Sequence, residues 1–352
     1  MVLALARYQQ SQGHDVSIIG IYGRNELYEV AESIGLTPKS AMKRPGADLL
    51  STVWTLRRFF QDKSADVVHS HNLVPHYLAA AACIGLSAKL VNTRHDMGHH
   101  YSSKQGDFLY KLAMKRTAFG VAVCEAARLE FVSKASIPDF KSHTIVNGID
   151  LSNYGLRSVI NKRLLLDTLD IRDEKVVFGN VGRVNPVKDH ETMLRAFHEC
   201  IQNGLNAILV IVGHGPALDS VKRTVNNLKI TKDVFFLGQR SDISEVLKGF
   251  DVFLQSSLTE GYSLALVEAA ISGLPIIATR VGGNAEIIKD GESGRLVSAR
   301  DVGAFSRAML DLGRSDETRS RYGENAHSWA TENGSVQTMY ERYLNLYQGI
   351  RT

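Results

Sequence analysis

Residues 255–286 read QSSLTEGYSLALVEAAISGLPIIATRVGGNAE, and this stretch decides the fold of the chain. Its first residue, Gln255, also ends FDVFLQ, residues 250–255. This apolar run between polar residues is typical of a short buried strand. We expect a loop at Ser256–Gly261 and then a helix at about Ser263–Ile271, which a glycine ends as a C-cap. The stretch therefore begins as strand, loop and helix.

The same order of elements follows again at once. A second apolar run, LPIIAT, precedes Gly282-Gly283 and a short helix that carries Glu286. Glycines at such turns let backbone amides approach a ligand, and the free amides at a helix start suit a phosphate group. In the first helix these amides begin at Ser263 and Leu264.

Two carboxylates frame the first loop and helix. Glu260 lies in the loop and Glu268 on the second turn of the helix, so their spacing gives them different tasks. Glu268 could accept hydrogen bonds from ribose hydroxyls beyond the phosphate, and Glu260 could hold the hydroxyls of a second sugar. Taken alone, each glutamate is more typical of a solvated surface charge, and the pattern of both is what favours a site.

Length and composition indicate a globular protein with room for two domains. The chain has 352 residues, 44% hydrophobic and 22% charged. Its net charge of +4 comes from 41 basic and 37 acidic residues, which is too balanced for nucleic acid as the main partner. Cys83, Cys124 and Cys200 are widely spaced and read as free thiols of a reducing compartment. We therefore expect a cytoplasmic protein.

Short apolar runs alternate with helical stretches along both halves. This pattern predicts an α/β fold with parallel sheets covered on both faces. The last helix, at about Gly334–Gln348, has an apolar stripe, and we expect it to pack on the first half. We expect one domain to comprise residues 1–155 plus 333–352 and the other residues 156–332. The expected strands are His14–Ile19, Asp66–His71, Lys89–Thr93, Gly120–Cys124, His143–Val146, Val176–Val181, Ala207–Val212, Val234–Leu237, Asp251–Leu254, Pro275–Ala278 and Gly294–Val297.

Several motifs together resemble one family. The pattern Glu260-Gly261-Tyr262-Ser263-x4-Glu268, followed by Gly-Leu-Pro and Gly-Gly-x-x-Glu, is similar to the signature of family 4 glycosyltransferases of the GT-B fold. The resemblance runs over nearly the whole chain. It implies two Rossmann-like domains facing a cleft, a nucleotide-sugar donor on the second domain, an acceptor on the first, and transfer with retention.

The start of the chain departs from the family pattern. The family opens with a strand, a glycine-rich loop and then a helix, whereas here the helix Val2–Gln12 comes first. We therefore expect the first domain to lack its first strand and glycine-rich loop. Either the start lies inside a longer protein, which we favour, or the protein is a fragment. The second possibility is the basis of one alternative function below.

Two cations follow a buried strand in NVGRVNPVKDH, residues 180–190. Arg183 can bind phosphate oxygens bidentately, and Lys188 can add a point charge. By resemblance they bind the donor diphosphate and stabilise the leaving group, so no metal is needed there. The alternative is two solvated basic residues beside a helix start. We expect Arg183, Lys188, Glu260 and His71 to be the catalytic residues.

The resemblance also implies the remaining contacts to the donor. Gly213, in the turn VGHGP, lets the backbone approach the ligand, and Gln239 and Arg240 fall where the family reads the base. The base and the sugar stay open, with UDP- and GDP-sugars both possible as substrates and no cofactor expected. The expected donor-binding residues are Gly182, Gly213, Gln239, Arg240, Glu260, Gly261, Tyr262, Ser263, Leu264 and Glu268.

The first half of the chain is rich in histidine. His69 and His71 alternate on one expected strand and so share a face. The family often has a histidine at the position of His71, lying against the transferred sugar. A zinc site is an alternative, because His76, His95, His99 and His100 lie nearby in the sequence, but we expect no metal. Candidate acceptor contacts are Arg94, His95 and Asp96, which could also be ordinary loop residues.

Basic and aromatic residues share two helices of the first half. One carries Trp54, Phe59 and Phe60 beside Arg57, Arg58 and Lys63; the other carries Phe108 and Tyr110 near Lys104, Lys111, Lys115 and Arg116. Such faces could dock on the inner surface of an anionic cytoplasmic membrane, as enzymes with lipid-linked acceptors do. The alternative is one buried aromatic face and one solvated basic face.

The sequence thus predicts a cytoplasmic glycosyltransferase. It would move a sugar from a nucleoside-diphosphate donor to an acceptor hydroxyl with retention, in the synthesis of cell-surface polysaccharide, lipopolysaccharide or glycolipid. The acceptor would be a sugar or a lipid-linked sugar. Two alternatives stay open at this point: a sugar-nucleotide epimerase of the same architecture, and an inactive fragment or binding protein.

Overall fold

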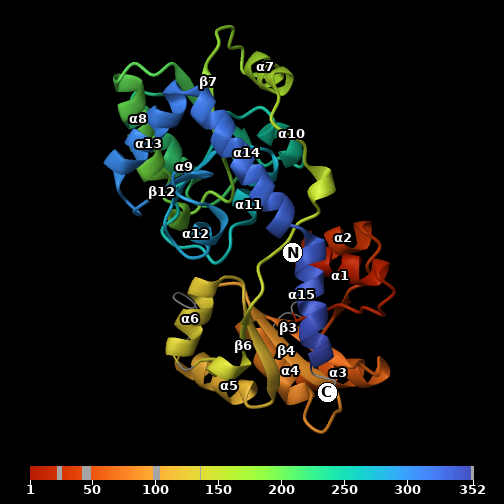
Figure 1. Ribbon diagram of the computed structural model, residues 1–352. Helices are drawn as coiled ribbons and strands as arrows, with labels where there is room; N and C mark the ends of the chain where they lie inside the picture. Colours follow the sequence, from red (N-terminus) through yellow and green to blue (C-terminus); the bar gives the residue numbers. More distant parts are fainter. Residues whose placement is uncertain (22–25, 42–48, 98–103, 135, 350–352) are drawn as a thin grey trace. The chain divides into compact units, whose positions relative to one another are not determined.

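The computed structural model describes residues 1–21, 26–41, 49–97, 104–134 and 136–349. The chain divides into two compact units (Figure 1). Unit 1 comprises Met1–Gly148 and Val336–Thr352, and unit 2 comprises Ile149–Ser335. The sequence had suggested boundaries at residues 155 and 333. In the structure the chain leaves unit 1 earlier, directly after Gly148.

Unit 2 is built on one parallel sheet of six strands in the order β12-β11-β10-β7-β8-β9. Strand β8 is buried along its whole length, because helices cover both faces of the sheet. Every strand expected in this half is present, with bounds that differ by one residue or less. The strands are β7 Val176–Val181, β8 Ala207–Val212, β9 Val234–Gly238, β10 Val252–Gln255, β11 Ile276–Thr279 and β12 Gly294–Val297.

The helices of unit 2 follow the strands and pack onto the sheet. Helix α8 contacts α13, and the core between them and the sheet contains Phe178, Phe197 and Phe305, all fully buried. The helices are α7 Val159–Thr168, α8 His190–Gln202, α9 Leu218–Asn227, α10 Ile243–Leu247, α11 Leu264–Ile271, α12 Asn284–Ile287, α13 Val302–Arg314 and α14 Asp316–Asn333, with one-turn helices η2 Leu151–Asn153 and η3 Pro186–Lys188.

Unit 1 contains a parallel sheet of four strands in the order β3-β4-β5-β6. Neighbouring residues of β4 face opposite sides: Leu90 packs with α3 and α4, and Val91 with α1 and α15. Its elements are α1 Val2–Ser11, β1 Ile19–Gly20, α2 Glu26–Ser33, β2 Lys39–Ser40, α3 Leu49–Asp62, β3 Val67–His71, α4 Leu73–Ala82, β4 Lys89–Arg94, α5 Lys104–Met114, β5 Thr117–Ala122, α6 Glu125–Ser133, η1 Asp139–Lys141, β6 Ser142–Thr144 and α15 Val336–Gly349.

The strand expected at His14–Ile19 is largely absent. Only Ile19–Gly20 forms a strand, β1, and it pairs with β2 in a separate sheet of two strands. Val16 and Ile18 instead pack beside Ala6, although the Ile18 carbonyl oxygen accepts a hydrogen bond from the Lys39 amide of β2 at 2.9 Å. Within the described residues, no strand joins this small sheet to β3. A strand needs a partner, so the apolar pattern alone does not make one here.

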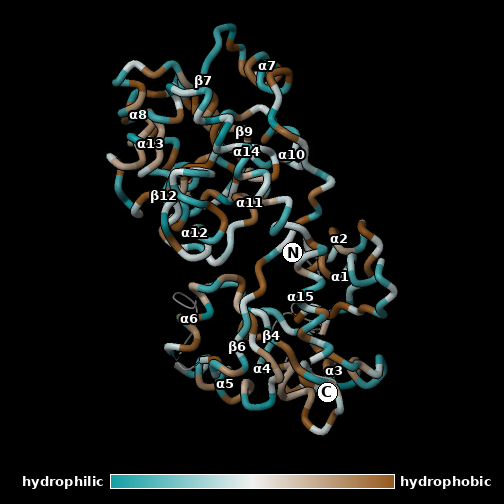
Figure 2. The backbone as a smooth tube through the Cα atoms, in the orientation of Figure 1, coloured by the Kyte–Doolittle hydropathy of each residue, from teal (hydrophilic) through white to brown (hydrophobic). Residues whose placement is uncertain are grey.

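Helix α15 packs within unit 1 although it is the last helix of the chain. In Figure 1 it is the blue helix beside the red and orange elements. Its stripe contributes Met339, Tyr340 and Tyr343 to the core that also holds Leu5 and Val91. Figure 2 shows hydrophilic and hydrophobic residues alternating along the helices, as expected where one face of each helix is buried.

Candidate functional site

The strand order of unit 2 creates a switch point between β7 and β10. These two strands are neighbours, but the chain continues from β7 toward β9 and from β10 toward β12, on opposite sides. The loops that follow these two strands therefore lead to opposite sides and leave a crevice between them. In such sheets, ligands bind in this crevice at the carboxyl ends of the strands. Both segments singled out in the sequence lie here: Gly182–Asp189 after β7 and Ser256–Ser263 after β10.

Lys188 and Glu260 meet at this switch point. The Lys188 Nζ atom lies 2.5 Å from Glu260 Oε1, and the two side chains are only 24% and 13% exposed. Lys188 ends the short helix η3, and its own amide donates to the side-chain oxygen of Asn185 at 3.2 Å, which fixes its backbone. The same Glu260 oxygen accepts a hydrogen bond from Ser257 Oγ at 2.5 Å. The Glu260 carboxylate is therefore held by two hydrogen-bond donors, one from each loop.

Arg183 lies in the same segment but stands apart from that pair. Its side chain is exposed, and no described residue forms a hydrogen bond or ion pair with it. It follows Gly182, whose carbonyl oxygen would lie 1.9 Å from a Cβ atom at Gly213. Gly213 is thus required where the ends of β7 and β8 touch. A ligand can therefore reach the guanidinium of Arg183 directly, whereas the ammonium of Lys188 is already paired with Glu260.

The glycines after β11 pack against the backbone of the loop that carries Glu260. Gly282 has φ of +49°, and a Cβ atom there would lie 1.6 Å from the carbonyl oxygen of Glu260. The Gly283 amide donates to the carbonyl of Gly261 at 2.9 Å. The sequence led us to expect that these glycines face a ligand. Instead, Gly282 faces the backbone of the loop that carries Glu260.

Helix α11 begins beside the same loop with its first turn uncapped. Ser263 is the N-cap residue, but its hydroxyl donates to Gln255 Oε1 at 2.8 Å and caps no amide. The first amides of α11, beginning at Leu264, therefore point out of the helix without a side-chain acceptor. An anion placed there would satisfy them and would gain from the helix dipole.

Glu268 lies on α11, half-buried, and its partner is Tyr154. Burial raises the pKa of Glu268, while the hydrogen bond from the Tyr154 hydroxyl opposes that rise. Tyr154 was not singled out in the sequence. It directly follows the one-turn helix η2, whose N-cap residue is Asp150.

The two residues expected to read the base lie at the end of β9. Gln239 and Arg240 are exposed, and Arg240 forms an ion pair with Asp242 at 2.5 Å. Gly238, immediately before them, accepts a hydrogen bond from the Gly213 amide at 2.7 Å. Their backbone is therefore tied to the glycine turn after β8, whereas the Arg240 side chain is already engaged.

In unit 1 three histidines stack at the carboxyl end of β3. The rings of His69 and His71 lie 4.3 Å apart between centroids, which confirms that they share a face. His71 Nδ1 lies 3.1 Å from His95 Nε2. Burial is the main cause that lowers the pKa of all three imidazoles; the charge of neighbouring imidazoles adds to it at His69 and His71, and the N-terminal ammonium group adds to it at His71 and His95. These rings are neutral at physiological pH and can donate or accept hydrogen bonds.

The cluster is fixed by α15 through His69. The His69 ring contacts Thr93 Oγ1 at 2.8 Å and Tyr347 Oη at 2.7 Å. Thr93 in turn lies 2.8 Å from Tyr343 Oη. Within the described ranges, no group of three or more potential ligands could hold a metal ion. The predicted candidates His99 and His100 fall outside those ranges.

His76 and Arg94 turn inward and do not join this cluster. His76 is fully buried between Ser70 Oγ at 3.0 Å and Thr117 Oγ1 at 3.1 Å. Arg94 is the last residue of β4, and its guanidinium lies 2.7 Å from Asp96 and over the ring of Phe131. Of the three expected acceptor residues, Arg94 therefore holds Asp96 in place, and His95 pairs with His71.

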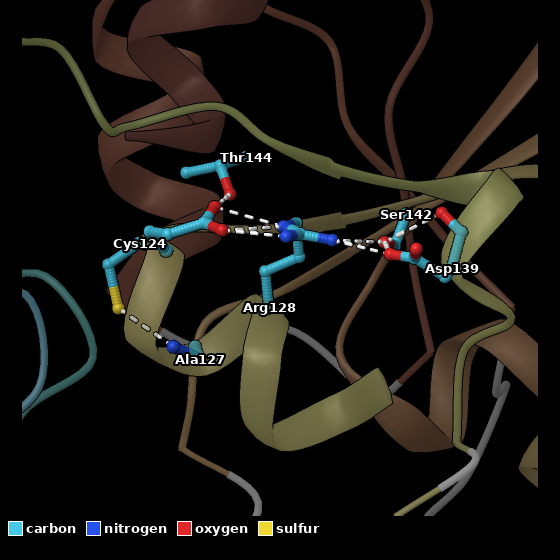
Figure 3. A network of polar contacts seen from close by, with 7 residues as sticks. Cys124, Ala127, Arg128, Asp139, Ser142 and Thr144 are labelled. Carbon is cyan, nitrogen blue, oxygen red and sulfur yellow. Dashed lines mark hydrogen bonds and ion pairs between the residues drawn. The ribbon is translucent and has the colours of Figure 1, made fainter. Parts of the chain in front are cut away.

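A second polar network, not foreseen from the sequence, lies at the start of α6 (Figure 3). Arg128 donates to Glu125 on its own helix and to Asp139 and Ser142 of the next segment. Glu125 also accepts from Thr144 on β6 at 2.6 Å. These bonds tie α6 to β6, so we assign the network to the stability of unit 1. A Glu and an Arg three residues apart at a helix start were the only signal.

The aromatic residues on the two basic helices divide between core and surface. Phe60 and Tyr110 are buried, whereas Trp54 and Phe108 are 62% and 66% exposed. Each helix thus carries a buried and an exposed aromatic ring, and docking on a membrane stays a prediction. In the part of the chain that the structure describes, no helix is long and apolar enough to cross a membrane.

Two family models match the chain. One describes glycosyl transferases group 1 and matches residues 162–329; the other describes glycosyltransferase family 4 and matches residues 1–153. Each match falls almost entirely within one compact unit.

Curated relatives and solved structures agree with these matches. N-acetyl-alpha-D-glucosaminyl L-malate synthase of Bacillus anthracis is 25% identical over 98% of this chain and 92% of its own. An Escherichia coli protein, UDP-Gal:alpha-D-GlcNAc-diphosphoundecaprenol alpha-1,3-galactosyltransferase, is 27% identical over 85% of this chain and 79% of its own. The crystal structure of Anabaena HepE in complex with UDP superposes with a TM-score of 0.89 at 19% identity, covering 99% of this chain and 95% of that one.

Proposed function

The chain belongs to the family 4 glycosyltransferases of the GT-B fold, and we propose that it transfers the sugar of a nucleoside-diphosphate sugar to an acceptor hydroxyl with retention. It is a glycosyltransferase that uses nucleotide sugars in the synthesis of glycans or glycolipids. The observation that carries the finer proposal is the arrangement at the switch point of unit 2. There the Lys188–Glu260 pair, the exposed Arg183 and the uncapped start of α11 gather on neighbouring loops.

This arrangement suits a diphosphate attached to a sugar. Arg183 and the first amides of α11 bind phosphate oxygens, Lys188 adds positive charge, and Glu260 accepts hydrogen bonds from sugar hydroxyls. Glu268 accepts from the ribose hydroxyls further along α11. The two cations supply the positive charge that the leaving group needs, so the proposed transfer is independent of metal ions.

The proposed reaction replaces one bond at the anomeric carbon by another on the same face. The bond from that carbon to the diphosphate oxygen breaks, and a bond to the acceptor oxygen forms. The acceptor's proton passes to the departing phosphate, whose negative charge Arg183 and Lys188 stabilise. This assistance is stronger in the transition state than in the bound donor, because the charge develops as the bond breaks.

A donor screen tests the proposal. UDP- and GDP-sugars are offered to the protein with candidate acceptors, and both the released nucleotide and the glycosylated product are measured. We expect both products in equal amounts from one donor class, with the anomeric configuration retained in the product. Release of nucleotide with no glycosylated acceptor would favour a sugar-nucleotide epimerase instead.

For the acceptor we propose a lipid-linked sugar at the inner face of the cytoplasmic membrane. The name of the Escherichia coli relative includes such an acceptor. Helix α5 supports the proposal, because Phe108, Lys111 and Leu112 are exposed on one face of it and the exposed Lys115 follows directly after its last residue.

Vesicle sedimentation tests this surface. We expect the protein to sediment with vesicles that contain phosphatidylglycerol and not with pure phosphatidylcholine, and Phe108→Ser to weaken the binding. Val159→Ser is the matched control, because Val159 is an exposed apolar residue of unit 2 at 81%. Equal sedimentation of the protein with both vesicle types would contradict the proposal.

A further inference from the structure

Glu260 Oε1 has two hydrogen-bond donors, and they differ in how far each can move without a shift of the backbone. One is the ammonium group of Lys188, at the end of a flexible side chain. The other is the hydroxyl of Ser257, three residues before Glu260 and completely buried. The long side chain of Lys188 can turn toward another anion, whereas the Ser257 hydroxyl can move only with its backbone.

The backbone at Ser257 is held from a neighbouring strand. Thr279, the last residue of β11, donates its hydroxyl to the carbonyl oxygen of Ser257 at 2.6 Å, and Thr279 is itself fully buried. The preceding residue, Ser256, donates to the carbonyl oxygens of Lys188 and Asp189. The two serines thus have different tasks. Ser256 ties the loop after β10 to the loop after β7, and Ser257 reaches the carboxylate.

The proposed function creates a need for the second donor. A diphosphate bound at the switch point competes for the Lys188 ammonium group, because it carries more negative charge than one carboxylate. Glu260 would then lose its strongest partner at the moment when it must hold a sugar. Its oxygen would also be left largely desolvated, since the side chain is only 13% exposed.

We propose that Ser257 is a positioning residue that keeps the Glu260 carboxylate aimed at the donor sugar after Lys188 has turned to the diphosphate. It touches neither substrate nor leaving group, and it acts only through Glu260. The proposal rests on the proposed function, and it adds a residue that the signature pattern from Glu260 to Glu268 does not include. The Ser257 hydroxyl is therefore a requirement for turnover rather than for nucleotide binding.

The test compares kcat with the affinity for free nucleotide in Ser257→Ala. Loss of a hydrogen bond to a charged group predicts a fall in kcat of roughly 10- to 100-fold. The Kd for UDP or GDP alone should change by less than about twofold, because free nucleotide carries no sugar for Glu260 to hold. The matched control is Ser306→Ala, which removes a buried hydroxyl of the same unit on α13, and its kcat should equal that of the parent.

A double-mutant cycle separates positioning from a merely structural role. In the Glu260→Gln background, Ser257→Ala should lower kcat further by less than about twofold, because its effect passes through the carboxylate. Ser256→Ala should slow both backgrounds equally. If Ser257→Ala proves unstable, Ser257→Cys has nearly the same shape with a weak donor and should show the same selective loss of kcat.

Two results would overturn the inference. One is a kcat for Ser257→Ala within twofold of the parent; the other is an equal loss in the parent and Glu260→Gln backgrounds. Failure of the proposed function looks different, because the unmodified chain would then produce no glycosylated acceptor from any donor.

Discussion

The ammonium group of Lys188 lies 2.5 Å from the carboxylate of Glu260, and the two residues come from loops after different strands. In the protein without ligand, a cation predicted to bind phosphate and a carboxylate predicted to bind sugar therefore neutralise each other. Neither is left as a lone charge in a mostly buried place. A donor that offers both a diphosphate and sugar hydroxyls can replace each half of this pair.

Removal of Lys188 and removal of Arg183 should therefore differ in their effect on stability. Lys188→Ala leaves Glu260 without its ion-pair partner, and we expect it to lower the free energy of unfolding by about 1–3 kcal/mol. Arg183→Ala removes an exposed side chain without a partner among the described residues and should change that free energy by less than about 0.5 kcal/mol. Urea unfolding of the three proteins measures the difference.

Both substitutions should nevertheless lower kcat by orders of magnitude, because both cations act on charge that develops as the diphosphate leaves. Steady-state kinetics with the donor found in the screen measures this effect. Normal turnover by either variant would remove that residue from the proposed mechanism.

Glu268→Gln should make the protein more stable and less able to bind nucleotide. Burial raises the pKa of Glu268 above its value in the unfolded chain, so the stability that its protonated form contributes is present at acid pH and is lost as pH rises through the folded pKa. At pH 8 the parent bears the cost of a half-buried charge, and glutamine does not. We expect a rise in Tm of about 1–4 °C at pH 8 that shrinks as pH falls toward about 4.

The same variant should bind UDP or GDP about 10- to 100-fold more weakly, because a neutral amide is a poorer acceptor for ribose hydroxyls. Differential scanning fluorimetry and calorimetric titration measure the two effects. Parental affinity in the variant would show that Glu268 does not contact the nucleotide.

Gly282→Ala should impair transfer although residue 282 itself carries no chemistry. A Cβ atom there would lie 1.6 Å from the Glu260 carbonyl oxygen, and φ is +49°, so the loop with Glu260 must move. We expect kcat to fall at least tenfold. Gly291→Ala is the matched control, because Gly291 also has a positive φ of +79° but nothing lies within 4 Å of its Cβ position. Equal activity in the two variants would contradict the assigned role.

Acid should weaken unit 1 through His76. Burial, with a smaller effect of the Arg94 charge, lowers the pKa of His76 to about 3, compared with about 6.5 in the unfolded chain. A lowered pKa means that the stability from neutral His76 is present above about pH 6.5 and is lost as pH falls toward the folded value. The loss approaches about 1.4 kcal/mol per pH unit.

His76→Gln should reduce that slope, even though it costs stability at every pH by disturbing the contacts with Ser70 and Thr117. Urea unfolding at pH 7, 6 and 5 gives both slopes. Identical slopes in the parent and the variant would show that His76 does not titrate between the folded and unfolded states.

Chelation by EDTA should leave the transfer rate unchanged, because Arg183 and Lys188 provide the charge that a divalent ion would otherwise supply. Assays with and without chelator, followed by addition of Mg²⁺ or Mn²⁺, measure the dependence. A strict requirement for either ion would contradict the metal-independent mechanism.

The sequence predicted unit 2 more accurately than unit 1, and the reason is burial. Strands such as Ala207–Val212 are covered on both faces, so each appears as an unbroken apolar run. In unit 1, helix α4 begins at Leu73 and has Pro75 in its first turn, where a proline in the sequence could also have marked a loop. Proline is tolerated there because the first amides of a helix need no acceptor within the helix.

The relationships within the site were harder to predict than its members. Lys188 and Glu260 were both singled out, but a contact across such a long stretch of sequence leaves no local pattern. The same holds for Thr279 and Ser257, and for Tyr154 and Glu268. Motifs identify residues that end up on neighbouring loops, whereas strand order decides which side chains touch.

Helix α15 has a consequence for how the protein is made. Unit 2 is one continuous segment, but unit 1 needs Tyr343 and Met339 from the far end of the chain to fill its core. A ribosome therefore finishes unit 2 before the last helix of unit 1 exists. At translation rates of 5–20 residues per second, the first part of unit 1 waits on the order of 10–40 s with part of its apolar sheet face covered by α1 alone. During that interval it is the part of the nascent chain most exposed to chaperones and proteases.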